Sequence, residues 1–122
     1  LEPIIGYKPK LYRFPGGSSN KVTNVDIQDC ISYINSQGMK YYDWNVSSGD
    51  AVSNAYTPDE LVENVMKDVL KYKTSVVLLH DANAKGATAE ALPGLIEALQ
   101  AANVNILPIT DSTPLVQHVE AK

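Results

Sequence analysis

The sequence predicts an α/β protein in which parallel strands alternate with helices. Short apolar runs, typical of buried strands, alternate with longer stretches whose apolar residues recur every three or four positions. Glycine- and proline-containing turns separate these segments. The connections between successive strands are long enough for crossover helices, which produce a parallel sheet with helices packed on it.

The first third of the chain predicts two strands and one helix. Residues 1–10 contain two prolines, and we expect them to be irregular. Residues 11–14 form a β-prone run that ends at a Pro-Gly-Gly turn. Residues 24–37 carry one apolar helical face and are followed by Gly38, a plausible stop at the C′ position. Residues 39–44 are typical of a second strand.

A capped helix follows a polar loop at residues 46–56. Thr57 can cap this helix, Pro58 suits its first position, and Glu60 can return a hydrogen bond to the cap backbone. The apolar stripe continues to about residue 73. Residues 75–79, apolar from Val76 onward, predict a third strand, covered on both faces.

The last third predicts a loop at 81–87, a helix, a fourth strand and a terminal turn. The helix runs through residues 92–99, and Pro93 limits how early it can be regular. Residues 104–109 predict the fourth strand, and residues 113–119 a short terminal helical turn.

Composition excludes several classes of protein. The chain has 122 residues, 44% of them hydrophobic and 20% charged, which is typical of one compact globular unit and not of a disordered chain. Its net charge of −4, without a Lys/Arg stripe, gives no support for nucleic-acid binding. The longest apolar run, residues 76–79, is too short to cross a bilayer. The single Cys30 lies on a helical apolar stripe, where it acts as a small hydrophobe.

Three of the predicted strands end in polar or aromatic residues. Arg13 to Gly17 lies at the end of the first strand, Asp43 to Asn45 at the end of the second, and His80 and Asp81 at the end of the third. In parallel α/β proteins, chemistry is carried out at the carboxyl ends of the strands. We therefore expect a functional site formed from these segments.

Each residue type in these segments has a chemical use and a plain structural alternative. The Arg13 guanidinium suits a carboxylate partner, although a surface ion pair would also explain it. The turn at Pro15 exposes the Gly16 N–H toward a developing oxyanion, although it can simply be a turn. Trp44 could form a wall of the site or belong to the core.

His80 is the candidate general acid. At the end of an apolar strand it could protonate a leaving amine, with Asp43 fixing the tautomer of its ring. Leu78, two residues earlier on the same face of the strand, could form the floor of a small apolar pocket. A structural histidine and a capping aspartate are the alternatives.

The segments Arg13-Phe14-Pro15-Gly16-Gly17-Ser18, Tyr42-Asp43-Trp44-Asn45 and Leu78-Leu79-His80-Asp81, in this order, resemble the last three motifs of the polysaccharide deacetylases. These are the NodB-homology enzymes of carbohydrate esterase family 4. The resemblance implies a distorted (β/α) barrel and metal-dependent removal of N- or O-acetyl groups from a glycan such as peptidoglycan, chitin or xylan. It also implies an extracellular or cell-envelope location in bacteria, either secreted or membrane-anchored.

The resemblance also implies roles for individual residues. Arg13 would hold a catalytic Asp, and the Gly16 amide, beside Pro15, would stabilise the oxyanion. Asp43 would tune His80, which would be the acid. The remaining two residues would contact the substrate, Trp44 along the groove and Leu78 at the acetyl methyl.

Two motifs of that family are absent from these residues. Neither the Asp-Asp pair that supplies the base and one metal ligand nor the His-x-x-x-His metal pair occurs, and the chain has only two histidines, His80 and His118. One copy of the chain therefore cannot build a His₂Asp metal site. We expect residues 1–122 to be the C-terminal half of a deacetylase domain, inactive alone and without bound zinc, whereas the complete domain would use a divalent metal.

A half barrel would leave exposed sheet edges, which pair with other chains unless they are covered. We therefore expect either the missing N-terminal half of the domain or a second copy of the chain as a partner, beside the acetylated polysaccharide. The alternative is a non-catalytic α/β domain. It would bind glycan along Trp44 and the tyrosines, or phosphate through the glycine, hydroxyls and lysine of residues 15–21. His118 is expected to be exposed and without a role.

Overall fold

The structure of the chain is a computed structural model that describes residues 2–51 and 56–122. The chain divides into two compact units: unit 1 consists of Leu1–Trp44 and Ile109–Lys122, and unit 2 of Asn45–Pro108. Each unit has its own cluster of buried apolar side chains, whereas the length alone predicts a single compact unit. Residues 52–55, part of the expected loop at 46–56, lie outside the described residues.

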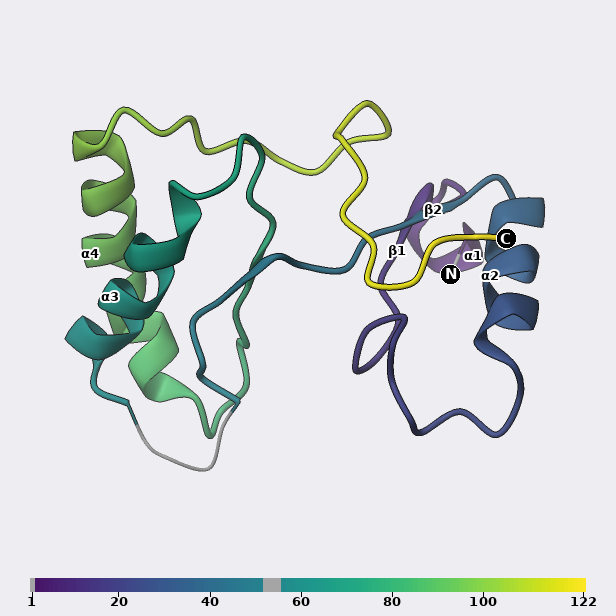
Figure 1. Ribbon diagram of the computed structural model, residues 1–122, viewed down its shortest axis with the longest axis horizontal. Helices are drawn as coiled ribbons and strands as arrows, with labels where there is room; N and C mark the ends of the chain where they lie inside the picture. The colour runs from purple at the N-terminus through teal and green to yellow at the C-terminus, as the bar shows by residue number, and fades with distance from the viewer. Residues whose placement is uncertain (1, 52–55) are drawn as a thin grey trace. The chain divides into compact units, whose positions relative to one another are not determined.

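Unit 1 contains one β-α-β crossover. Its elements, in chain order, are α1 (Glu2–Ile5), β1 (Leu11–Tyr12), α2 (Ile27–Ser36) and β2 (Lys40–Tyr41). β1 and β2 pair in parallel with Tyr12 opposite Tyr41, and α2 connects them (Figure 1). The core of the unit consists of Phe14, Ile31, Ile34 and Tyr41, with Cys30 packed against it, as expected for a cysteine on an apolar stripe.

The ends of α2 follow from local chemistry. The Asp26 side chain accepts a hydrogen bond from the Gln28 N–H and caps the first turn. Gly38 has φ 75°, the left-handed conformation that glycine adopts most easily, and the Met39 N–H returns to the Ile34 carbonyl. This is a Schellman ending, so the prediction of a stop at Gly38 is confirmed.

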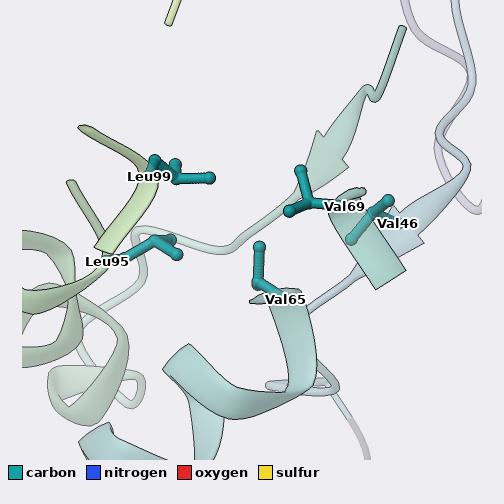
Figure 2. Close-up of a cluster of buried hydrophobic side chains, with 5 residues drawn as sticks. All are labelled: Val46, Val65, Val69, Leu95 and Leu99. Carbon is teal, nitrogen blue, oxygen red and sulfur yellow. The ribbon is translucent and has the colours of Figure 1, made fainter. Parts of the chain in front are cut away.

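Unit 2 contains a second β-α-β crossover and one further helix. Its elements are β3 (Val46–Ser47), α3 (Pro58–Val69), β4 (Val77–Leu78) and α4 (Gly86–Ala101). β3 and β4 pair in parallel, and α3 and α4 lie side by side (Figure 1). Figure 2 shows the core that they enclose with β3: Val46, Val65, Val69, Leu95 and Leu99.

The two helices of unit 2 begin in different ways. α3 has the complete capping box predicted from the sequence: Thr57 accepts from the Glu60 N–H, and Glu60 accepts from the Thr57 N–H. α4 has no side-chain cap and begins at Gly86, well before Pro93, so the expectation that Pro93 limits the start of the helix is wrong. Pro93 is exposed, and the apolar face of α4 is buried on both sides of it, which offsets the missing N–H.

Several predicted helices and strands differ from the observed ones, because their formation depends on contacts with distant parts of the chain. Residues 104–109 form no strand in the described chain; the Val104 N–H closes α4 on the Leu99 carbonyl, and Ile106 and Leu107 are exposed. Residues 113–119 form no helix, because their backbone bonds to β2 and to the residues after it. The expected irregular start contains α1, and the expected loop at 46–56 contains β3.

The predicted class, α/β with parallel strands, is confirmed, but its sheet is not continuous. Two separate two-stranded parallel sheets are present in the described residues instead of one four-stranded sheet. No helix in residues 2–51 and 56–122 is long and apolar enough to cross a membrane.

Candidate active site

The carboxyl end of β4 presents His80 as the sequence predicts. Val77 and Leu79 pack against the core of unit 2. Because successive side chains along extended chain point to opposite sides, Leu78 and His80 share the other face. The His80 side chain keeps 35% of its surface exposed, so it is held by the protein and still reaches solvent.

A buried carboxylate holds the imidazole of His80. Asp50 Oδ1 lies 2.8 Å from His80 Nδ1, and Asp50 Oδ2 accepts the His80 backbone N–H at 2.8 Å. Oδ2 also accepts the Thr88 hydroxyl at 2.9 Å. The carboxylate therefore accepts hydrogen bonds from both the ring and the backbone of His80, and these two bonds fix the direction of the side chain.

The protonation of the pair follows from these bonds. Burial alone would raise the pKa of Asp50, but the hydrogen bonds from the His80 ring, the His80 backbone and Thr88 outweigh it, and the pKa is lowered. An ionised carboxylate only accepts, so Nδ1 of the ring must carry the proton that it shares with Asp50. Nε2 is then the ring atom that can take up or release a proton toward a substrate.

Asp50 takes the position next to His80 for which the sequence predicts Asp43. The two residues of the His80 pair, Asp50 and His80, both belong to unit 2, whereas the Asp43 carboxylate is bound within unit 1. Sequence reasoning missed Asp50 because it placed residue 50 in a polar loop. The tertiary structure supplies what the sequence lacks: the parallel pairing of β3 with β4 puts the ends of the two strands together, and Asp50 follows β3 by three residues.

Asp43 is 2% exposed and holds two loops of unit 1 together. Its Oδ1 accepts the Ser18 N–H at 2.7 Å, and its Oδ2 accepts the Ser18 hydroxyl and, at 2.8 Å, the His118 N–H. The Ser18 hydroxyl also accepts the Val119 N–H at 3.0 Å. The structure therefore gives Asp43 a structural role, joining the turn after β1 to residues 118–119.

The turn after β1 has the form that its sequence predicts. The Gly17 N–H bonds the Phe14 carbonyl at 2.8 Å, with Pro15 and Gly16 at the centre of the turn. Gly16 has φ 75°, as the third residue of a type II turn requires. Pro15 and Gly16 are both exposed, and within the described chain the Gly16 N–H donates to no protein acceptor, so it stays available to a ligand.

Arg13 and Trp44 lie near this turn and differ in how far their side chains are exposed. Arg13 is exposed and forms no ion pair with any described residue. Trp44 is half-buried, and the His118 ring packs edge-to-face on it, with the ring centroids 4.9 Å apart. His118 is exposed as expected, but it has a role: its Nε2 donates to the Trp44 carbonyl at 2.8 Å and its Nδ1 lies 3.3 Å from the Ser19 hydroxyl.

Two further expectations concern ligands. Within residues 2–51 and 56–122, no three His, Cys, Asp or Glu side chains are placed together to hold a metal ion, so the residues present do not fit the metal that the family resemblance implies. The expected phosphate loop also differs. Its N–H groups at Gly17, Ser18 and Asn20 all donate within unit 1, which leaves fewer amides for an anion.

Two β-α-β crossovers with parallel strands, and a carboxylate-held histidine beside a strand end, define an α/β protein with a candidate acid–base pair. Solved structures of deacetylases are similar to this chain in both sequence and fold. The chain is 34% identical to the catalytic domain of a peptidoglycan N-acetylglucosamine deacetylase from Eubacterium rectale, with a TM-score of 0.88 over 97% of this chain and 55% of that chain. It is 25% identical to the polysaccharide deacetylase Bc1974 from Bacillus cereus, with a TM-score of 0.70 over 96% of this chain and 56% of that chain.

A Streptococcus mutans CE4 esterase, 22% identical, shares the fold with a TM-score of 0.65 over 79% of this chain and 42% of the esterase chain. Among curated proteins, YheN of Bacillus subtilis, named as a polysaccharide deacetylase, is 32% identical over 106 residues. No family model matches the chain.

The resemblance to polysaccharide deacetylases is thus confirmed by both sequence and fold. It extends over part of those proteins only: the chain spans about half of the first two solved structures and 34% of YheN.

Proposed function

We propose that this chain contributes the acid side of a polysaccharide deacetylase, an enzyme that hydrolyses N- or O-acetyl groups on a bacterial glycan. The His80–Asp50 pair is the observation that carries the proposal: a buried carboxylate holds Nδ1 at 2.8 Å and leaves Nε2 to exchange a proton. The likeness to a peptidoglycan N-acetylglucosamine deacetylase supports an acetylated sugar as the substrate.

In this proposal, His80 is the general acid. Breakdown of a tetrahedral intermediate expels an amine or alkoxide that needs a proton, and histidine is the side chain that most often supplies one as a general acid. Asp50 stabilises the charged ring while it holds that proton, and orients Nε2 toward the leaving group. Leu78, on the same face of the chain, would contact the acetyl methyl.

The other site residues that the sequence predicts keep the roles that the resemblance implies. The proposal gives no catalytic role to Asp43. The free Gly16 N–H, in the turn at Pro15, would donate to the oxyanion. Exposed Arg13 would hold a carboxylate that lies outside these residues, and Trp44 would line the sugar groove. The metal of the complete enzyme would supply electrophilic polarisation of the acetyl carbonyl, and its ligands would also lie outside these residues.

The partner that we propose is the rest of a deacetylase domain or, failing that, a second copy of the chain. Ile106 is 53% and Leu107 is 76% exposed, in a segment that the sequence predicts as a strand. Unsatisfied strand-forming residues of this kind pair with a neighbouring strand when one is supplied. A cell-envelope or extracellular location belongs to the same proposal, since acetylated polysaccharide is found there.

Acetate release by the whole protein that contains this chain tests the proposal. The substrates are N-acetylglucosamine oligomers, peptidoglycan and acetylxylan, assayed with added Zn²⁺. We expect His80→Gln to lower kcat by about 10²- to 10⁴-fold, the usual contribution of a general acid. Lys21→Ala, in the loop after the Pro-Gly-Gly turn, is the control and keeps wild-type kcat.

Two results would contradict the proposal. One is that none of the three glycans loses acetate. The other is that His80→Gln and Lys21→Ala release acetate equally fast.

A further inference from the structure

A buried hydroxyl from α4 is the third partner of the Asp50 carboxylate. Thr88 Oγ1 donates to Asp50 Oδ2 at 2.9 Å, and both residues are buried, at 4% and 8% exposure. A threonine hydroxyl in such a position needs a partner, because a buried polar group without a hydrogen bond destabilises the fold. Here that partner is the carboxylate that holds the histidine.

The helix presents Thr88 in a fixed direction. Thr88, Ala91, Leu95 and Leu99 are the buried residues of α4, and their spacing of three and four places them on one face. Leu95 and Leu99 belong to the core of unit 2 (Figure 2). The position of the hydroxyl is therefore set by the packing of a 16-residue helix and not by a flexible loop.

The Thr88 hydroxyl does not cap the helix, although it lies in the first turn of α4. Ser and Thr near a helix start commonly cap exposed N–H groups. α4 has Lys85 at its N-cap and no side-chain cap, yet Thr88, in its first turn, bonds Asp50 and not the helix backbone. The contact therefore serves Asp50.

We propose that Thr88 is a positioning residue: its hydroxyl holds the Asp50 carboxylate in the orientation in which Oδ1 meets the His80 ring. A carboxylate rotates about its Cβ–Cγ bond unless both oxygens are held. Both His80 contacts come from one residue, the ring to Oδ1 and the N–H to Oδ2 at 2.8 Å, whereas Thr88 holds Oδ2 from α4. The catalytic meaning of this contact rests on the proposed function, whereas the contact itself does not.

NMR of the full 122-residue chain tests the inference without any assay of acetate release. The ring ¹⁵N shifts of His80 report which nitrogen carries the proton, and the carboxyl ¹³C shift of Asp50 reports its titration. In Thr88→Val, we expect the population of the Nε2–H tautomer to rise about tenfold, since one of the bonds that hold the carboxylate is lost. We also expect the Asp50 titration to move to higher pH, and Thr88→Ser to restore both signals.

A threonine elsewhere in unit 2 provides the matched control. Thr57→Val removes the cap of α3 and so weakens the same unit, but Thr57 bonds Glu60 and not Asp50. It should leave both His80 and Asp50 signals unchanged. If Thr88→Val behaves like Thr57→Val, Thr88 only packs and the inference is wrong.

Two fallbacks keep the test decisive if Thr88→Val does not fold. Thr88→Ala removes the same hydroxyl with less bulk and should give the same two shifts. In the wild-type chain, the Thr88 hydroxyl proton should exchange slowly with water; fast exchange would overturn the inference. Because neither readout involves acetate, a failed deacetylase assay leaves this result intact, and the reverse also holds.

Discussion

Asp43 in unit 1 and Asp50 in unit 2 are both buried aspartates, and in each both carboxylate oxygens accept hydrogen bonds. Their donors differ. Asp43 takes backbone N–H groups and the Ser18 hydroxyl, none of which titrates near neutral pH. Asp50 takes a histidine ring N–H, and that histidine side chain is 35% exposed.

The histidines of the two units differ in the same way. His118 has one ring nitrogen bonded to the Trp44 carbonyl and the other beside the Ser19 hydroxyl and 4.0 Å from Asp43. His80 has only Nδ1 engaged within the described chain. Burial of a carboxylate beside a histidine is therefore not enough to indicate chemistry; the histidine must also keep one nitrogen free.

Removing the Asp43 carboxylate should give the largest loss of stability. Asp43→Ala leaves the Ser18 N–H, the Ser18 hydroxyl and the His118 N–H without their acceptor in a buried place. We expect unit 1 to lose about 3 kcal/mol or more, since each unsatisfied buried donor costs about 1–3 kcal/mol. Amide hydrogen exchange of α2 and β2 measures this, and unchanged protection there would contradict the structural role of Asp43.

Asp50→Asn should lower stability less than Asp43→Ala does. It should also change which nitrogen of the His80 ring carries the proton. The amide keeps one acceptor oxygen but places an NH₂ group against the donors of His80 or Thr88, which we expect to cost unit 2 about 2 kcal/mol. The His80 ring should shift toward its Nε2–H tautomer, seen in ¹⁵N NMR. If the tautomer stays as in the wild type, Asp50 does not control His80.

Gly17→Ala tests how tightly the Asp43 cluster is packed. At φ 82°, an added Cβ would lie 3.0 Å from Trp44 Cη2 and 3.1 Å from Asp43 Oδ1. Gly38 has φ 75° with nothing within 4 Å of such a Cβ, so Gly38→Ala isolates the backbone strain of about 1–2 kcal/mol. We expect Gly17→Ala to destabilise unit 1 by about 1 kcal/mol more than Gly38→Ala in urea unfolding. Equal losses would show that the cluster yields easily.

Acidification should have the smallest effect on stability, and it should act on unit 2 through Asp50. The pKa of Asp50 is lowered from 3.8 by its hydrogen bonds, which outweigh burial. Its contribution is therefore complete above that ordinary value and is lost as the pH falls through the lowered pKa. Hydrogen exchange of α3 and α4 between pH 5 and about 2 should show protection falling only in the acid part of this range. In Asp50→Asn, this component should be absent.

Local chemistry in the sequence was sufficient for the end of α2 and the start of α3. The Thr57–Glu60 capping box and the Gly38 stop are confirmed, because caps and stops depend on residues only a few positions apart. Cys30 on an apolar stripe and His80 at a strand end are likewise placed as predicted. The parallel β-α-β order follows from the lengths of the connections.

Only the tertiary structure decided which carboxylate meets which histidine. Asp43 lies at the end of the second predicted strand and Asp50 in the loop that follows it, and nothing local indicates which of the two meets His80. The pairing of β3 with β4 brings Asp50 to His80, and the C-terminal residues 118–119 bring donors to Asp43 and its partner Ser18. Strand pairing and loop docking join residues 30 to 101 positions apart, and their energies depend on partners that no local pattern of residues contains.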